Sequence, residues 1–172
     1  MPSTSDIFLG VDHVAGIIEQ WQRERPDLDP SPLGVVGRLH RVANRLSEEL
    51  LAVYAEFDLG EGEFDVLATL RRGGAPYSLT PGELAASTMV TSGAISKRVE
   101  RCERQGWVIR STNDRDGRGR VVTLTDAGRD LIDRAYTAHV ANEHRLVGLI
   151  RESDRRLLAD ALRRWASALD LS

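Results

Sequence analysis

The sequence predicts a mainly α-helical fold with one small β-hairpin. Along most of the 172-residue chain, apolar residues recur every three to four positions, which is the spacing of amphipathic helices. Only two short runs, 107–110 and 121–124, have the β-branched and aromatic content of strands. The hydrophobic content of 41% is enough to build a core, so the composition does not indicate intrinsic disorder.

Three helices are predicted before residue 73. The first covers about residues 5–25 and ends before the prolines of the segment 26–32. The second is long, covering about 32–57, and we expect Gly60 to end it. The third covers 61–72 and is followed by two glycines. All three have an apolar stripe along one side.

Two short helices joined by a tight turn are predicted in the middle of the chain. Thr80 and Glu83 are spaced as a capping box, which begins a helix over 81–87. A second helix is predicted over about 91–105 and ends at Gly106. This arrangement is a candidate helix-turn-helix.

The two strand-like runs flank a polar, glycine-rich segment, 113–119, so they predict a hairpin, or wing. A long helix follows over about 125–150, and Ser153 is expected to cap a last one. The apolar stripes of the terminal helices are larger than one small winged helix can cover. We therefore expect a homodimer that buries them.

Charge is distributed unevenly along the chain. The segment 91–120 has eight basic and four acidic residues, a net charge of +4. The rest has 15 basic and 22 acidic residues, a net charge of −7. A basic segment on an acidic body is typical of a nucleic-acid-binding protein, although a solvated charged face has the same composition.

Enzyme chemistry is not indicated. The chain lacks the G-x-S-x-G, P-loop and G-x-G-x-x-G patterns. Its four histidines, His13, His40, His139 and His144, show no metal-ligand spacing with carboxylates or with the single cysteine. We therefore expect no cofactor and no metal.

The single cysteine, Cys102, is spaced with Ile95 and Val99 on one side of the second short helix, so we expect it to be a packing residue. It has no partner for an internal disulfide, which is typical of a reducing compartment. No apolar run is long enough to span a bilayer, and the first ten residues lack the basic start of a signal peptide. These features predict a cytoplasmic protein without a membrane partner.

The chain resembles the MarR family of winged helix-turn-helix transcription factors over about residues 35–169. The resemblance rests on motifs from the helix-turn-helix, the wing and the start of the following helix. They are Leu84-Ala85, the run 92–101, Gly106-Trp107-Val108, the run 114–118 and the run 122–128, which contains an LT-x-x-G pattern.

The resemblance implies one MarR-type domain with three regions. Residues 58–124 would form the winged helix-turn-helix, and residues 31–57 and 125–172 the dimerisation helices. Residues 1–30 would be an additional N-terminal helix. The resemblance implies that the protein regulates transcription, as a repressor rather than as an activator. A twofold dimer implies a pseudo-palindromic operator in double-stranded DNA.

Residues of the second short helix and the wing are the candidate DNA contacts. Polar residues near a recognition helix N-terminus reach bases and phosphates, and wing arginines reach the minor groove or phosphates. Thr91 or Ser92 would also serve as a helix cap, and the wing would otherwise be a solvated hairpin. The candidates are Thr91, Ser92, Ser96, Lys97, Arg115, Arg118 and Arg120.

The additional helix resembles that of the urate-responsive PecS, HucR and MftR branch of the family. In that branch a Trp, an Asp and two Arg form the ligand site, and the matching residues here are Trp21, Asp65, Arg98 and Arg110. The resemblance implies urate as effector. Physical reasoning alone leaves other interpretations: a structural ion pair between Asp65 and Arg98, another small anion such as an aromatic carboxylate or an aconitate-like acid, or a protein-interaction module.

Overall fold

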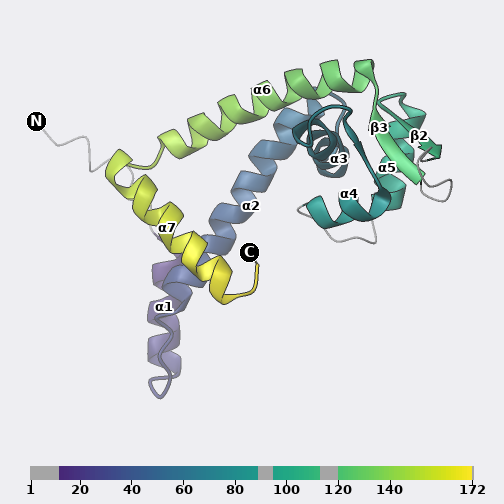
Figure 1. Cartoon of the computed structure of the whole chain (residues 1–172). Coiled ribbons are helices and arrows are strands. Elements are labelled where there is room, and N and C mark those ends of the chain that lie inside the picture. The colour runs from purple at the N-terminus through teal and green to yellow at the C-terminus, as the bar shows by residue number, and fades with distance from the viewer. Residues whose placement is uncertain (1–11, 89–94, 113–119, 172) are drawn as a thin grey trace, which may run out of the picture. The chain divides into compact units, whose positions relative to one another are not determined.

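The computed structural model describes residues 12–88, 95–112 and 120–171. Within them the chain forms helices and a small sheet that contains the two strands expected from the sequence (Figure 1). The helices are α1 (His13–Glu24), α2 (Leu33–Ala55), α3 (Glu61–Arg72), α4 (Pro81–Ser87), α5 (Ile95–Arg104), α6 (Asp126–Gly148) and α7 (Glu152–Ala168). The strands are β1 (Ser78–Leu79), β2 (Val108–Thr112) and β3 (Arg120–Leu124).

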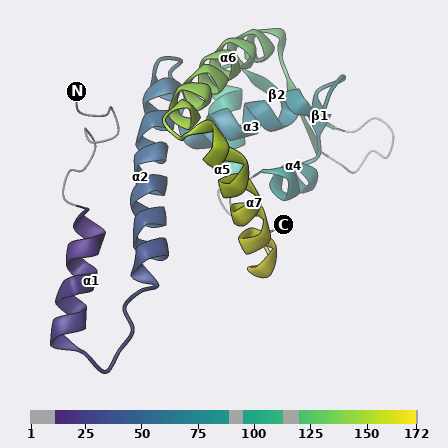
Figure 2. The ribbon, with the colours of Figure 1, turned by 90° about the vertical axis from the view of Figure 1, so that its left-hand side faces the viewer.

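The chain divides into two compact units between residues 48 and 49, and each is described by itself. In the first unit, α1 lies alongside the first half of α2 (Figure 2). Val14 is buried there, with its methyl groups next to Gly37 of α2. Asp12 accepts a hydrogen bond from the backbone of Val14, at 3.2 Å, and pairs with Arg38. The cap places the start of α1 at His13, later than predicted; residues 5–11 lie outside the described part.

The second unit is built around α3. Its residues Val66, Leu67 and Leu70 have no exposed surface, and the helix packs against both α5 and α6. The capping box of α4 forms as predicted: Thr80 Oγ1 accepts from the Glu83 backbone at 3.2 Å, and Glu83 Oε2 accepts from the Thr80 backbone at 2.8 Å. The core around α3 therefore holds α5 in place, and the capping box defines where α4 begins.

The sheet is antiparallel, with strand order β1-β3-β2. The two wing strands pair from Val108 with Leu124 to Thr112 with Arg120. The third strand, β1, was not predicted, because two residues are too few for a periodic pattern to show. It pairs with the middle of β3 and fixes the wing to the helices.

Two helix ends differ from the prediction. Asp58, not Gly60, ends α2: it has a φ of 56°, and the Leu59 N–H donates to Tyr54 O at 3.0 Å in a Schellman motif. Gly60 instead precedes α3, where its N–H donates to Glu63 Oε2 at 3.0 Å. At the other end of the chain, Arg151 occupies the N-cap position of α7 without a side-chain capping hydrogen bond, and Ser153 lies inside the helix.

The LT-x-x-G run joins the sheet to α6. Thr125 Oγ1 caps the helix by accepting from the Gly128 backbone at 3.0 Å, and it donates to the carbonyl groups of Gly106 and Trp107. A Cβ on Gly128 would lie 2.0 Å from Trp107 O, so this position requires a glycine.

None of the helices in the described ranges is long and apolar enough to cross a membrane.

Replacing Gly128 tests this junction. We expect Gly128→Ala to destabilise the protein by about 1–3 kcal/mol, because the added methyl group overlaps backbone that cannot move independently. Gly148, at the end of the same helix, has open space around its Cβ position, so Gly148→Ala should be neutral or stabilising by up to ~1 kcal/mol. Urea unfolding measures both. Equal stabilities would show that the junction is not under steric constraint.

Cys102 is buried, as predicted, beside Ile95 and Val99. Burial raises the pKa of its thiol to about 12, with the charge of Glu63 adding to the effect. Because the folded-state pKa lies above the ordinary value of 9.0, the thiol favours folding below pH ~9, and this contribution is lost as the pH rises toward 12.

Cys102 is therefore expected not to act as a redox sensor. At pH 8, iodoacetamide should alkylate it only at the rate of unfolding, and mild peroxide should leave DNA binding unchanged. Mass spectrometry of native and urea-unfolded protein measures the difference. Rapid alkylation of the native protein would contradict the buried position.

Candidate DNA-binding surface and effector site

Helix α5 turns one side inward and another outward. Its buried side, Ile95, Val99 and Cys102, packs into the core cluster against α3. Ser96 and Lys97 are exposed on the rest of the helix surface. The candidate contacts Thr91 and Ser92 lie outside the described residues. The described part of α5 therefore presents a polar surface from a helix that is firmly fixed on its other side.

The wing adds a second basic element beside α5. Arg120 begins β3, is exposed, and lines a small cavity of about 110 Å³ together with Ser96 and Arg110. Arg115 and Arg118 belong to the segment 113–119, outside the described residues. Because β2 and β3 pair up to Thr112 and Arg120, that segment connects two adjacent strand ends.

Arg110 lies against the wing-facing side of α5. Its Nη2 donates to Ser96 O at 3.3 Å, and its Nε is 3.4 Å from Glu103 Oε2. Both contacts are long, and about one third of the side chain is exposed. The contacts therefore constrain the guanidinium group only weakly.

Arg98 lies on a different side of α5, against α3. Its guanidinium group passes directly over Gly62: a Cβ at that position would be 2.4 Å from Arg98 Nε and 2.9 Å from Cζ. Its Nη1 is buried and has no hydrogen-bond acceptor among the described residues. A buried guanidinium N–H without an acceptor is uncommon in folded proteins, so this position calls for an explanation.

Asp65 follows Gly62 by about one turn of α3, and its Oδ2 is buried. Asp65 and Arg98 therefore belong to the same contact between α3 and α5. Ser96, which Arg110 contacts, is about 200° around the helix from Arg98. In this conformation the two arginines lie on different sides of α5. Trp21 belongs to the other unit, where its side chain is 51% exposed on α1.

Sequence reasoning missed Gly62 and Glu63. Glu63 is buried, accepts from the Gly60 backbone, and lies 3.6 Å from Arg101 Nε. The sequence contains one signal for Gly62: glycine has a low helix propensity, so its presence in the first turn of a helix needs an explanation. The reason is the close approach of Arg98.

Within the described ranges, no group of three His, Cys, Asp or Glu side chains is arranged to hold a metal ion. Tyr54 and His139 instead join α2 to α6: Tyr54 Oη is 3.2 Å from His139 Nδ1, and its ring stacks on Phe64 at 4.1 Å. Burial raises the pKa of Tyr54 to about 12, with Glu61, Glu143 and Asp65 adding to the effect. These contacts are structural.

Comparisons with known proteins agree with this geometry. The family model described as MarR family matches residues 57–119. The transcriptional regulator PecS of Dickeya dadantii is 38% identical over 88% of this chain and 91% of its own length. The chain is also similar to MarR of Escherichia coli in complex with operator DNA, with 25% identity, a TM-score of 0.67, and coverage of 80% of this chain and 98% of that one.

A similar fold occurs in Sco3205, a MarR family regulator of Streptomyces coelicolor solved with DNA. Its TM-score is 0.73 at 24% identity, over 83% of this chain and 93% of that one. These relatives are transcriptional regulators rather than enzymes. The chain belongs to the MarR family and is a DNA-binding transcriptional regulator with a winged helix-turn-helix.

Proposed function

We propose that this regulator is a homodimeric repressor that binds a pseudo-palindromic operator and leaves it when a small planar anion binds. Residues 58–124 would read DNA, the helices of 31–57 and 125–172 would form the dimer, and the helix before residue 30 would contribute to the effector site. A repressor acts on the chromosome, so we assign it to the cytoplasm.

DNA binding would use the exposed side of α5 and the wing. Ser96 and Lys97 are accessible on a helix whose buried side is fixed in the core, which suits entry into a major groove. Arg120 is exposed at the base of the wing, where it would meet a phosphate. Thr91, Ser92, Arg115 and Arg118 remain predicted contacts.

Single alanine variants test this surface. Lys97→Ala and Arg120→Ala should each weaken operator binding and reduce the slope of log affinity against log salt by ~1, because each removes one phosphate contact. Arg23→Ala, an exposed arginine of α1, is the matched control and should leave the slope unchanged. Gel shifts over a salt series measure the slopes. Wild-type slopes for both variants would remove these residues from the interface.

The dimer proposal rests on the apolar residues of α7. This helix has no buried residue, yet its apolar stripe includes Leu157, Leu162 and Trp165, of which Leu157 is 68% exposed. A continuous exposed apolar stripe is typical of an interface. A second copy of the chain carries the same stripe, and a twofold axis would bring the two stripes together. Two recognition helices would then meet half-sites about 10 bp apart.

Leu162→Asp should abolish dimerisation, because it would bury an unpaired charge between the subunits. Leu28→Asp is the control, since Leu28 is 54% exposed in the turn between α1 and α2. Sedimentation velocity measures the oligomeric state, and circular dichroism checks that the helices remain. Leu162→Ala, a milder change, should shift the dimer toward monomer at low concentration. A Leu162→Asp variant that stays a folded dimer would refute this interface.

The effector proposal rests on one observation, the buried Arg98 Nη1 that has no acceptor among the described residues. A planar anion would supply that acceptor and repel the carboxylate of Asp65. We infer that urate is the effector, since Trp21, Asp65, Arg98 and Arg110 match the residues of the urate-responsive branch. For Arg110 to join Arg98 at one ligand, it would have to leave Ser96 O and Glu103.

The same helix would couple the ligand to DNA. Arg98 shares α5 with Ser96 and Lys97, so a movement that re-pairs Arg98 also moves the DNA-reading residues. A ligand that prefers the DNA-free conformation ~100-fold changes the equilibrium by ~2.7 kcal/mol. By linkage, operator DNA weakens the binding of that ligand by the same factor.

Variants of the effector site should separate DNA binding from ligand response. Asp65→Asn and Arg110→Ala are expected to keep operator affinity within several-fold and to lose urate-induced release. Gly62→Ala should also lose urate-induced release, because the added Cβ displaces the Arg98 side chain, but here we expect operator affinity to change as well, since Arg98 shares α5 with Ser96 and Lys97. Urate, an aromatic carboxylate and aconitate are titrated against the protein–operator complex. If Asp65→Asn and Arg110→Ala released DNA at the wild-type urate concentration, this effector site would be wrong.

A further inference from the structure

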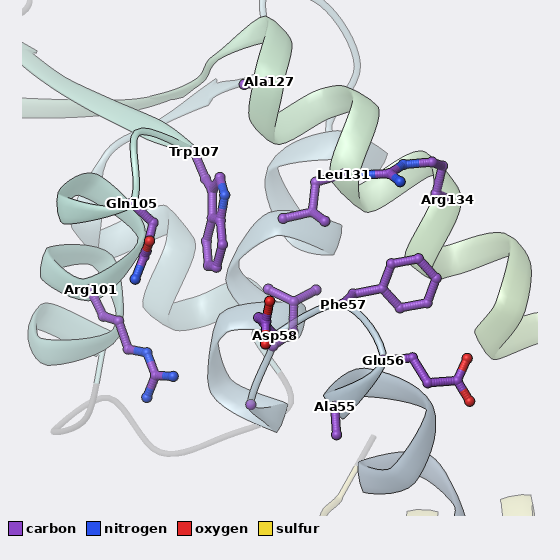
Figure 3. A pocket seen from close by; sticks show the side chains of 12 residues that line it. Ala55, Glu56, Phe57, Asp58, Arg101, Gln105, Trp107, Ala127, Leu131 and Arg134 are labelled. Atoms are coloured by element: carbon purple, nitrogen blue, oxygen red, sulfur yellow. The ribbon is translucent and has the colours of Figure 1, made fainter.

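A cavity of about 870 Å³ lies where the end of α2, the last turn of α5 and the first turns of α6 meet (Figure 3). All of its lining residues belong to the unit 49–172. The described lining does not include Asp65, Arg98 or Arg110, so it is separate from the proposed effector residues. Its volume is within the range of ~300–1,000 Å³ that is typical of small-molecule sites.

One wall of the cavity is aromatic and rigid. Trp107 packs partly against the core, and Figure 3 shows its indole projecting into the space beside Leu131. Its backbone is held at both ends: the N–H donates to Cys102 O at 3.0 Å, and the carbonyl oxygen accepts from the backbone and the hydroxyl of Thr125, each at 3.0 Å. A ring that docks here meets a preorganised apolar surface, so little ordering cost opposes binding.

Opposite charges line the cavity next to this wall. Figure 3 shows Arg101 and Asp58 below the indole, on different elements of the unit. Arg101 is half-exposed, and its ion pair with Glu63 is long, at 3.6 Å, so this contact constrains its guanidinium group only weakly. Asp58 is exposed at the α2 Schellman turn, where its φ of 56° directs the side chain from a fixed backbone.

We propose that this cavity binds an aromatic α-amino acid. The ring would lie against Trp107 and Leu131, the carboxylate would pair with Arg101, and the ammonium group would pair with Asp58. A guanidinium fork suits a carboxylate, and an aromatic side chain joined to an amino acid head group carries all three features in one small molecule.

Singly charged aromatic compounds fit this lining less well. An aromatic acid would meet the repulsion of Asp58 and Glu56, and an aromatic amine would meet that of Arg101 and Arg134, all four of which line the cavity. Only a ligand that carries both a positive and a negative charge can pair with the acidic and the basic side chains of the lining. This separates the ligand class from the planar anions proposed for the effector site.

A ligand in this cavity would directly contact two elements of the proposed DNA-binding surface. Arg101 is on the recognition helix, and Trp107 immediately precedes the first wing strand. A ligand that bridges Arg101 to Asp58 therefore ties the recognition helix to the end of α2. We expect operator affinity to change when the amino acid is bound.

The test uses three compounds with the same ring. Calorimetric titration of the full-length protein compares L-phenylalanine with phenethylamine, which lacks the carboxylate, and 3-phenylpropionate, which lacks the ammonium group. We expect L-phenylalanine to bind at least ~10-fold more tightly than either analogue, since each lost charge pair costs a charge-assisted hydrogen bond. Urate at saturating concentration should not displace it.

Two variants give opposite signatures. Asp58→Asn, which retains a residue that tolerates positive φ, should weaken L-phenylalanine and phenethylamine and leave 3-phenylpropionate unchanged or stronger. Arg101→Gln should weaken L-phenylalanine and 3-phenylpropionate and spare phenethylamine. Asp130→Asn and Arg104→Gln, exposed neighbours outside the cavity, are the matched controls.

Three results would overturn the proposal: no binding of L-phenylalanine at millimolar concentration, binding that neither Asp58→Asn nor Arg101→Gln changes, or competitive displacement by urate. The proposed repressor function is tested separately by operator binding, and it would stand or fall independently of these outcomes.

Discussion

Thr125 forms hydrogen bonds with three parts of the unit 49–172, and the relative positions of these parts depend on it. Its backbone N–H and hydroxyl hold the carbonyl of Trp107, its hydroxyl also reaches Gly106, and the same oxygen caps α6. The end of the recognition helix, the start of the wing and the start of the long helix are thereby fixed to one side chain. Gly128 allows this approach because it has no Cβ. In the LT-x-x-G run, the threonine therefore supplies the hydrogen bonds of the junction, and the glycine supplies the space for it.

Helix α5 makes different contacts on its different sides. The apolar side, which includes Val99, is buried against α3, and the outward side is exposed. Between these, Arg98 crosses to α3 over Gly62, and Arg110 approaches from the wing. A helix held on several sides moves as one body, so a change at any of these contacts reaches the residues proposed to read DNA.

The sequence predicted the order and type of the long elements because their apolar periodicity is strong. It also predicted the buried Cys102 and the capping box at Thr80, where single residues determine local hydrogen bonds. It did not predict β1, whose two residues have no period, or the turn at Asp58, where an aspartate takes the conformation usually given to glycine.

The candidate site was only partly predictable. Local context placed Asp65 and Arg98 at one contact between helices, since both lie near buried positions. Side-chain direction was not accessible to that reasoning: nothing in the sequence places Arg110 against Ser96 rather than beside Arg98. The role of Gly62 likewise requires the position of a side chain 36 residues away, which no local pattern contains.

The uncovered stripe of α7 has a consequence for the amount of protein in the cell. A single copy presents Leu157, Leu158 and Leu162 to solvent on a helix without a buried residue. A helix of this length has little stability of its own in water, so an unassembled subunit would display the kind of apolar segment that chaperones and proteases recognise. Assembly would then protect each subunit from turnover, and surplus single chains would be removed preferentially. In that case the steady-state level of the regulator is set as much by its pairing equilibrium as by its rate of synthesis.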